Sequence, residues 1–270
     1  MNTARQAIDE LISQLAEQGY IASEQIATTL HLARALQRPI LIEGPPGVGK
    51  TELANASAAM LKLPLFRLQC YEGLDESKAL YDWKYSKQLL YVQVLKEQLQ
   101  GILGGANDLS AAVERLHNFD DIFYSERFLE PRPLLSALQS DDGAVLLIDE
   151  IDKADIEFPN DLLLELDRME FHVYETQETI QARNRPVVII TSNNEKELPD
   201  AFLRRCFFHY IRFPDEETMT RIVDVHFPDI KRSLLREALA VFYQIREVNG
   251  LKKRPSTSEL LDWIKLLLAE

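Results

Sequence analysis

Apolar and polar positions along this chain follow two different periods, which predict helices in some segments and strands in others. At residues 4–17 and 23–37 apolar side chains recur every three to four positions, a pattern that predicts two amphipathic helices. Buried strands are predicted at five short apolar runs, residues 40–43, 65–70, 144–148, 187–191 and 207–213. Because helical stretches separate these runs, the sequence predicts an α/β fold with a parallel sheet and helices on both faces.

The pattern changes at Pro214, where strand signals stop. Residues 215–268 carry helical periodicity only, so we predict an α/β domain at residues 1–213 and a small all-helical domain at residues 214–270. The α/β part also contains surplus sequence. One βα crossover unit needs only about 30 residues, and the stretch at 84–120 is periodic and contains little Pro or Ser. We therefore predict a helical insertion there.

A glycine-rich loop joins the predicted strand 40–43 to a helical stretch that ends at Leu61. The loop consists of Gly44, Pro45, Pro46, Gly47, Val48, Gly49, Lys50 and Thr51. Its glycines let backbone N–H groups turn inward around an anion, and the helix that follows adds the positive end of its dipole. Lys50 can reach the β- and γ-phosphates, and the Thr51 hydroxyl can ligate Mg²⁺. The order of strand, loop and helix predicts binding of a nucleoside triphosphate.

Two carboxylates follow the apolar run at 144–148. Asp149 and Glu150 would lie at the carboxyl edge of a parallel sheet, where open α/β folds bind their ligands. This position suits Asp149 to support the Mg²⁺ held by Thr51, and it suits Glu150 to activate a water molecule as a general base. The alternative is an ordinary strand end with two solvated acids. The phosphate loop upstream favours the catalytic interpretation.

Composition narrows the class of protein. The chain has 270 residues, of which 46% are hydrophobic and 27% charged, enough for one sizeable core and a smaller satellite domain. The net charge of −13 disfavours nucleic acid as a partner, although a ring pore could carry local Lys and Arg. We expect a cytoplasmic protein without a membrane span. No apolar run reaches the roughly 18 residues of such a span, the N-terminus has no signal-peptide core, and Cys70 and Cys206 lack metal spacing.

Taken together, the motifs resemble those of the AAA+ ATPases, and within them the MoxR-type branch. The AAA+ resemblance is carried by residues 44–51, 145–152, 190–193 and 203–206. The features similar to MoxR-type members, above all to the CoxD and CbbQ/NorQ type, are residues 68–73 and 254–257. The resemblance covers residues 20–268 and implies the AAA+ P-loop sheet followed by a helical lid. It also implies that the insertion and a hairpin at 171–182 face the ring pore or the client.

The resemblance implies three further site residues. Asn193 matches a polar sensor that hydrogen-bonds the γ-phosphate or the attacking water, although Ser-Asn-Asn is also favourable turn chemistry. Arg204 and Arg205 lie where the family carries an arginine that reaches into the neighbouring subunit's site and stabilises transition-state charge. A surface ion pair is the alternative for either arginine, and the sequence does not choose between them.

The lid departs from the family pattern at Ser258, where many relatives carry an arginine that contacts the γ-phosphate. Arg254, or the lysines at 252–253, could replace that arginine from just upstream, so Arg254 is a candidate nucleotide-binding residue. The alternative is a solvated basic turn before a helix that Ser256 or Thr257 caps.

The resemblance implies a Mg²⁺-dependent enzyme that converts ATP and water to ADP and phosphate. It further implies a homo-oligomer, a hexameric ring, that acts as a chaperone. Its client protein would be remodelled or activated during metalloenzyme maturation, with help from a partner that contains a von Willebrand factor A domain. Two alternatives stay open. One is an AAA+ motor that acts on nucleic acid, and the other is a nucleotide-gated binding module with little turnover.

Overall fold

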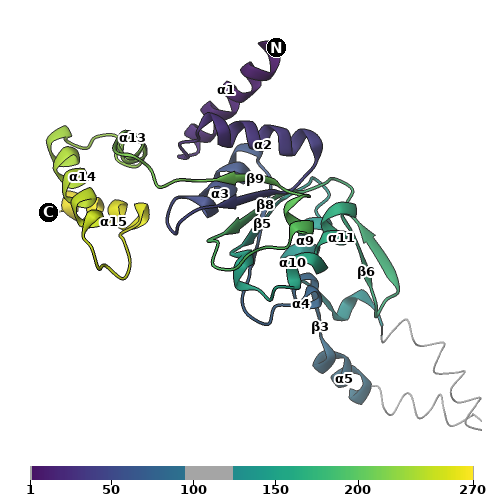
Figure 1. Ribbon diagram of the computed structural model, residues 1–270. Helices are drawn as coiled ribbons and strands as arrows, with labels where there is room; N and C mark the ends of the chain where they lie inside the picture. Colours follow the sequence, from purple (N-terminus) through teal and green to yellow (C-terminus); the bar gives the residue numbers. More distant parts are fainter. Residues whose placement is uncertain (1, 95–123, 270) are drawn as a thin grey trace, which may run out of the picture.

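A computed structural model of the chain describes residues 2–94 and 124–269. Its centre is a five-stranded parallel sheet (Figure 1). In spatial order the strands are β2 (Leu65–Gln69), β5 (Val145–Asp149), β8 (Val187–Ser192), β1 (Ile40–Glu43) and β9 (Phe207–Tyr210). All five predicted strands are present, and the predicted parallel α/β sheet is confirmed.

Helices cover both faces of the sheet because each central strand is buried on both sides. In β5, for example, Val145 and Leu147 pack into one hydrophobic cluster, whereas Leu146 and Ile148 pack into the other. The first cluster is completed by α1 (Asn2–Glu17), α2 (Glu24–Leu36) and α3 (Lys50–Leu61). The second is completed by α9 (Pro133–Leu138), α10 (Phe158–Asp161) and α11 (Leu163–Arg168), which lie on the opposite side of the sheet in Figure 1.

In the region at 71–130, the described residues 71–94 and 124–130 combine short helices with two short strands that the sequence does not predict. It contains α4 (Glu76–Leu80), α5 (Tyr85–Val94) and the 3₁₀ turn η1 (Glu126–Phe128). It also contains the strands β3 (Tyr81–Trp83) and β4 (Leu129–Pro131), which pair antiparallel with each other. Strands of three residues are too short for a period of two to be recognised. Of the predicted insertion, residues 95–120 lie outside the described part of the chain.

A second hairpin joins β6 (Glu170–Val173) to β7 (Glu178–Gln181), as the sequence predicts. The short helix α12 (Asp200–Leu203) then leads into β9. The predicted strand at 207–213 is too long, because β9 ends at Tyr210. Ile211 still donates a backbone hydrogen bond to Glu43 at 2.7 Å, and Pro214, which has no N–H group, cannot continue the ladder.

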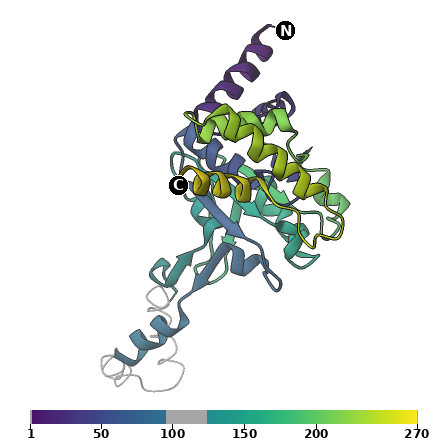
Figure 2. The ribbon, with the colours of Figure 1, turned by 90° about the vertical axis from the view of Figure 1, so that its left-hand side faces the viewer.

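The C-terminal part is all helical, as predicted. It consists of α13 (Glu216–His226), α14 (Arg232–Glu247) and α15 (Thr257–Ala269), which share a hydrophobic cluster of their own. An extended segment after β9 connects them to the sheet, and they lie to one side of it (Figures 1 and 2). Asp215 starts α13 by accepting a hydrogen bond from the Thr218 N–H at 2.8 Å. None of the helices in the described residues is long and apolar enough to cross a membrane.

Candidate functional site

The glycine-rich loop lies between β1 and α3, at the carboxyl edge of the sheet. Gly47 and Gly49 have φ angles of 76° and 89°, in the left-handed region that favours glycine. Gly49 also precedes α3 in place of a capping side chain. The first N–H groups of this helix therefore have no side-chain acceptor and are available to an anion.

Lys50 is buried at the base of this loop, with only 7% of its surface exposed. Its Nζ donates hydrogen bonds to the carbonyl oxygens of Gly44 (2.5 Å) and Pro45 (3.1 Å) and to Asn193 Oδ1 (2.7 Å). Burial lowers the pKa of Lys50, and the carboxylates of Asp152 and Glu150 act against this shift. The structure thus brings two of the predicted site residues, Lys50 and Asn193, into direct contact.

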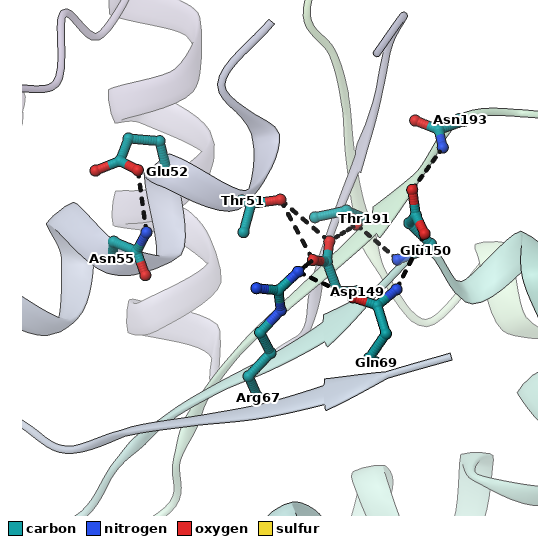
Figure 3. Close-up of polar contacts among 9 residues, drawn as sticks. All are labelled: Thr51, Glu52, Asn55, Arg67, Gln69, Asp149, Glu150, Thr191 and Asn193. Atoms are coloured by element: carbon teal, nitrogen blue, oxygen red, sulfur yellow. Dashed lines mark hydrogen bonds and ion pairs between the residues drawn. The ribbon is translucent and has the colours of Figure 1, made fainter. Parts of the chain in front are cut away.

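Asp149 ends the central strand β5 and is almost fully buried. Thr51 Oγ1 donates to its Oδ1 at 3.2 Å, and Thr191 Oγ1 donates to the same oxygen at 2.5 Å. Arg67 Nη2, from the edge strand β2, lies 2.5 Å from the other oxygen, Oδ2 (Figure 3). The predicted neighbours Thr51 and Asp149 are therefore in contact, and Asp149 is not a solvated surface acid.

Glu150 follows Asp149 in a left-handed conformation, with φ 55° and ψ 53°, so its side chain leaves the strand in a different direction. Two amides hold its carboxylate from opposite sides (Figure 3). Gln69 Nε2 donates to Oε2 at 3.0 Å, and Asn193 Nδ2 donates to Oε1 at 3.1 Å. Its backbone N–H also donates to Thr191 Oγ1 at 2.9 Å. The orientation of this carboxylate is therefore defined by the surrounding strands.

A hydroxyl and a carboxylate at this position fit Mg²⁺, which prefers oxygen ligands. Thr51 and Asp149 are in contact and would hold such an ion together, so their role at the metal stays a prediction. Lys50 and the N–H groups of the loop would hold the phosphates beside it.

Arg204 and Arg205 follow α12 and differ in their surroundings. Arg205 Nε forms an ion pair with Asp167 at 2.7 Å, and its Nη1 donates to the Ala201 carbonyl at 2.9 Å. Arg204 is exposed, and its side chain makes no hydrogen bond or ion pair with the residues that the structure describes. Among the described residues, neither arginine contacts the phosphate loop or the carboxylates of Asp149 and Glu150 in its own chain.

The lid helices and the core enclose a cleft of about 860 Å³ that opens onto Gly47, Val48 and Gly49. Thr257, the first residue of α15, donates its backbone N–H to the Gly47 carbonyl at 3.3 Å. The Thr257 hydroxyl is buried and has no hydrogen-bond partner within the described chain. A ligand bound in the cleft would supply the missing hydrogen-bond partner of this hydroxyl.

Arg254, the candidate lid residue, is exposed and does not line this cleft. The arginines that do line it are Arg212 and Arg221. At the start of α15, Ser256 and Glu259 instead form a reciprocal cap, in which the Ser256 N–H donates to Glu259 Oε2 at 2.6 Å. The capped helix that the sequence offered as the alternative for this segment is therefore present.

Sequence reasoning missed the contribution of β2 to the site. Arg67 and Gln69 are two positions apart, so both side chains project from the same face of the strand. A usable signal was present, because polar side chains alternate with Phe66 and Leu68 in this otherwise apolar run. Thr191 was noted only as part of a strand, although it binds both Asp149 and the Glu150 backbone.

Comparison with known proteins agrees with this arrangement. Residues 39–206 match the AAA domain family, in its dynein-related subfamily, and the chain belongs to this family. The match begins just before β1 and ends just before β9, so it includes the phosphate loop, both carboxylates and Asn193. AAA domains bind nucleotide, in agreement with the sequence prediction.

A solved structure shows the same fold at low sequence identity. The Hsp104 chain of S. cerevisiae, in its ADP complex, is 18% identical and superposes with a TM-score of 0.53. That match covers 99% of the present chain but 48% of the Hsp104 chain. An ATPase candidate from Cytophaga hutchinsonii is 16% identical with a TM-score of 0.47, and the match covers 96% of this chain and 62% of that one. The curated proteins contain no match.

Proposed function

We propose that this protein is a Mg²⁺-dependent ATPase of the MoxR type, acting in the cytoplasm. The observation that supports this most strongly is a continuous line of side chains from the phosphate loop to a carboxylate. Lys50 donates to Asn193 Oδ1, and Asn193 Nδ2 donates to Glu150 Oε1. These two hydrogen bonds support the proposal, because they would hold a general base at a fixed position relative to the residue that binds the γ-phosphate.

Each residue then has a role in phosphoryl transfer. Lys50 and the N–H groups after Gly49 bind the phosphates, while Asn193 orients Glu150. Glu150 accepts a proton from the attacking water as the water oxygen bonds to the γ-phosphorus and the bond to ADP breaks. Thr51 and Asp149 would hold Mg²⁺, which would supply positive charge to the phosphate oxygens. Thr257 completes the site from the lid.

A complete site would need an arginine from a second copy of the chain. Its own described residues bring no arginine beyond Arg67 to the carboxylates. Arg204 and Arg205 make no contact with the loop of their own chain among the described residues, and the Arg204 side chain has no hydrogen-bond or ion-pair partner there. We therefore propose a homo-oligomeric ring, hexameric by resemblance, in which one arginine of this pair completes the neighbouring site.

The client-facing part of the ring is proposed to combine the insertion with the β6–β7 hairpin. Glu175, in the hairpin turn, accepts hydrogen bonds from Tyr81 Oη in β3 (2.6 Å) and from Tyr85 Oη at the start of α5 (3.5 Å). The pKa of Tyr81 is raised by burial and by this carboxylate, so the hydroxyl stays protonated as a donor. These hydrogen bonds would hold the hairpin and α5 side by side, so that both could contact the same client protein. A chaperone role in metalloenzyme maturation, with a von Willebrand factor A partner, fits the MoxR-like motifs.

The separate hydrophobic cluster of α13–α15 supports a domain boundary at residues 213 and 214. We propose that residues 214–270 act as a lid on the nucleotide cleft. Tyr243 Oη donates to the Pro214 carbonyl at 2.8 Å, which ties the connecting segment to the lid side of the boundary.

Steady-state phosphate release from ATP tests the enzymatic part. We expect Glu150→Gln to lower turnover by more than about 100-fold while ADP affinity stays within about threefold, because only the base is lost. Lys50→Ala should weaken nucleotide binding itself. Glu178→Gln, which neutralises an exposed carboxylate in β7, is the matched control and should behave as wild type. Unchanged phosphate release in both site variants would refute the ATPase and favour a nucleotide-gated module.

Nucleic acid and client protein can be separated with the same variant. A pull-down with Glu150→Gln and ATP should retain a protein partner, and added DNA or RNA should leave the ATPase rate of the wild type unchanged. Stimulation by nucleic acid that falls steeply with salt would instead favour the motor alternative.

A further inference from the structure

Asp149 has a resident positive partner, Arg67, which comes from the edge strand of the sheet. The Nη2 atom of Arg67 lies 2.5 Å from Asp149 Oδ2 and 2.9 Å from Gln69 Oε1. Figure 3 shows its guanidinium beside the Asp149 carboxylate, on the same side of the sheet as Thr51. We propose that Arg67 is a counter-cation for Asp149 and competes with the divalent ion for this carboxylate. The inference rests on the proposed function, because Thr51 and Asp149 are the proposed metal residues.

Burial makes a positive partner necessary. The Asp149 side chain is only 4% exposed, and a carboxylate removed from water is unfavourable unless it is paired or hydrogen-bonded. Thr51 and Thr191 donate neutral hydrogen bonds to it, mainly at Oδ1. Lys50 carries the other positive charge of the loop, but its hydrogen bonds go to carbonyl oxygens and to Asn193. Arg67 is therefore the ion-pair partner of Asp149 among the described residues.

Arg67 is also exposed enough to release Asp149. Its side chain is 52% exposed, so the guanidinium can regain hydration when it releases Asp149. Because arginine remains protonated at all ordinary pH values, the competition depends on the concentration of the divalent ion and not on proton loss. A lysine at this position would keep the charge but lose the planar contact with both Asp149 and Gln69.

Arg67 also links the two carboxylates. Its Nη2 contacts Gln69, and Gln69 Nε2 donates to Glu150 Oε2 at 3.0 Å. When Arg67 releases Asp149, Gln69 loses the charged donor that fixes its amide. Arrival of the ion at Asp149 would therefore also loosen one of the two amides that hold Glu150. Arg67 is in this view a positioning residue that couples metal occupancy to the orientation of the base.

The test measures metal affinity directly and does not depend on turnover. Mn²⁺, in place of Mg²⁺, is titrated into the full chain with saturating ADP and followed by electron paramagnetic resonance. Removing one positive charge beside the carboxylate should favour a cation, so Arg67→Gln should bind Mn²⁺ roughly three- to tenfold more tightly than wild type. Arg67→Lys should lie between the two. Arg168→Ala, which removes the arginine of an exposed ion pair with Glu170, is the matched control and should leave the affinity unchanged.

Each outcome decides between hypotheses. Equal or weaker Mn²⁺ affinity in Arg67→Gln would overturn the competition, since Arg67 would then be a surface pair or a support of the metal site. Thermal unfolding near the wild-type temperature shows that the variant is folded, and Arg67→Ala repeats the test without an amide. If wild type with ADP binds no Mn²⁺ at all, the proposed ATPase fails instead. If wild type binds Mn²⁺ tightly and the Arg67 variants bind it equally well, the proposed role of Arg67 is refuted and the proposed ATPase is not.

Discussion

Asn193 and Glu150 come from the ends of different strands, and their side chains are joined by a hydrogen bond of 3.1 Å from Asn193 Nδ2 to Glu150 Oε1. The other end of the Asn193 amide accepts from Lys50. One amide therefore contacts the residue proposed to hold phosphate and the residue proposed to activate water. The backbone N–H of Asn193 is in turn fixed by the buried carboxylate of Asp152 at 3.2 Å.

This relationship predicts the effect of Asn193→Ala. Turnover should fall by roughly 10- to 100-fold, because a base that is misplaced by about 1 Å loses catalysis on this scale. Nucleotide affinity, measured by fluorescence titration of a labelled ADP, should change by less than about threefold. Asn55→Ala removes an exposed amide that bonds Glu52 on α3 and serves as the control. A large loss of affinity with normal turnover would contradict the assigned role.

Alanine substitutions at the two arginines after α12 should change the free energy of unfolding by different amounts. Arg204→Ala should leave the free energy of unfolding within about 0.5 kcal/mol of wild type, because the Arg204 side chain makes no hydrogen bond or ion pair with the described residues. Arg205→Ala should cost up to about 1 kcal/mol, since it removes the partly exposed ion pair with Asp167. Urea unfolding measures both values.

Turnover then identifies the arginine that acts on the neighbour. The variant that lacks it should lose most phosphate release yet keep ADP affinity. Mixing it with a Glu150→Gln chain should recover some activity, because a mixed ring contains sites with both groups intact. Loss of ADP affinity in the same variant would place that arginine in its own subunit's pocket.

Contact between the phosphate loop and the lid predicts a strong effect of Gly47→Ala. A Cβ at residue 47 would lie 2.2 Å from Ser256 Cβ, and the φ of 76° is itself unfavourable for alanine. The variant should bind ADP at least about tenfold more weakly than wild type, a loss of about 1.4 kcal/mol. Ser256→Gly in the same chain removes the nearest atom and should restore part of the affinity. Titration of both variants checks this, and the absence of any rescue would show that backbone strain alone is responsible.

The cap of α15 predicts a pH-dependent stability of the lid. Hydrogen bonds from Ser256, assisted by Lys253, lower the pKa of Glu259 from its ordinary value of 4.5 to about 2. Because the pKa of Glu259 is lower in the folded state, its ionised carboxylate stabilises the fold. This contribution is complete at pH values above the unfolded-state pKa of 4.5 and is lost as the pH falls toward 2. Glu259→Gln should therefore destabilise by roughly 0.5–1 kcal/mol at pH 7. Melting curves should show this difference shrinking below pH 4.5, whereas a constant difference would refute the assignment.

Much of the fold followed from local pattern. The central strands are continuous apolar runs because helices cover both faces of the sheet there, as in β5 from Val145 to Asp149. The short strands β3 and β4 were missed, because three residues carry no readable period and their pairing joins Trp83 to Leu129 across a long stretch of chain. Such a pair is decided by tertiary contacts and leaves little trace in either segment.

The same distinction applies to the site. By itself, the sequence determined the phosphate loop and its helix, the two carboxylates after an apolar strand and the all-helical end, because each is a local pattern with a chemical requirement. Only the tertiary structure decided that Arg67 and Gln69 reach Asp149 and Glu150, that Asn193 bridges Lys50 and Glu150, and that Thr257 rather than Arg254 reaches the cleft. The reason is physical. These contacts depend on strand order and on the direction in which each side chain leaves its strand, and both are set by packing between segments that are far apart in the chain.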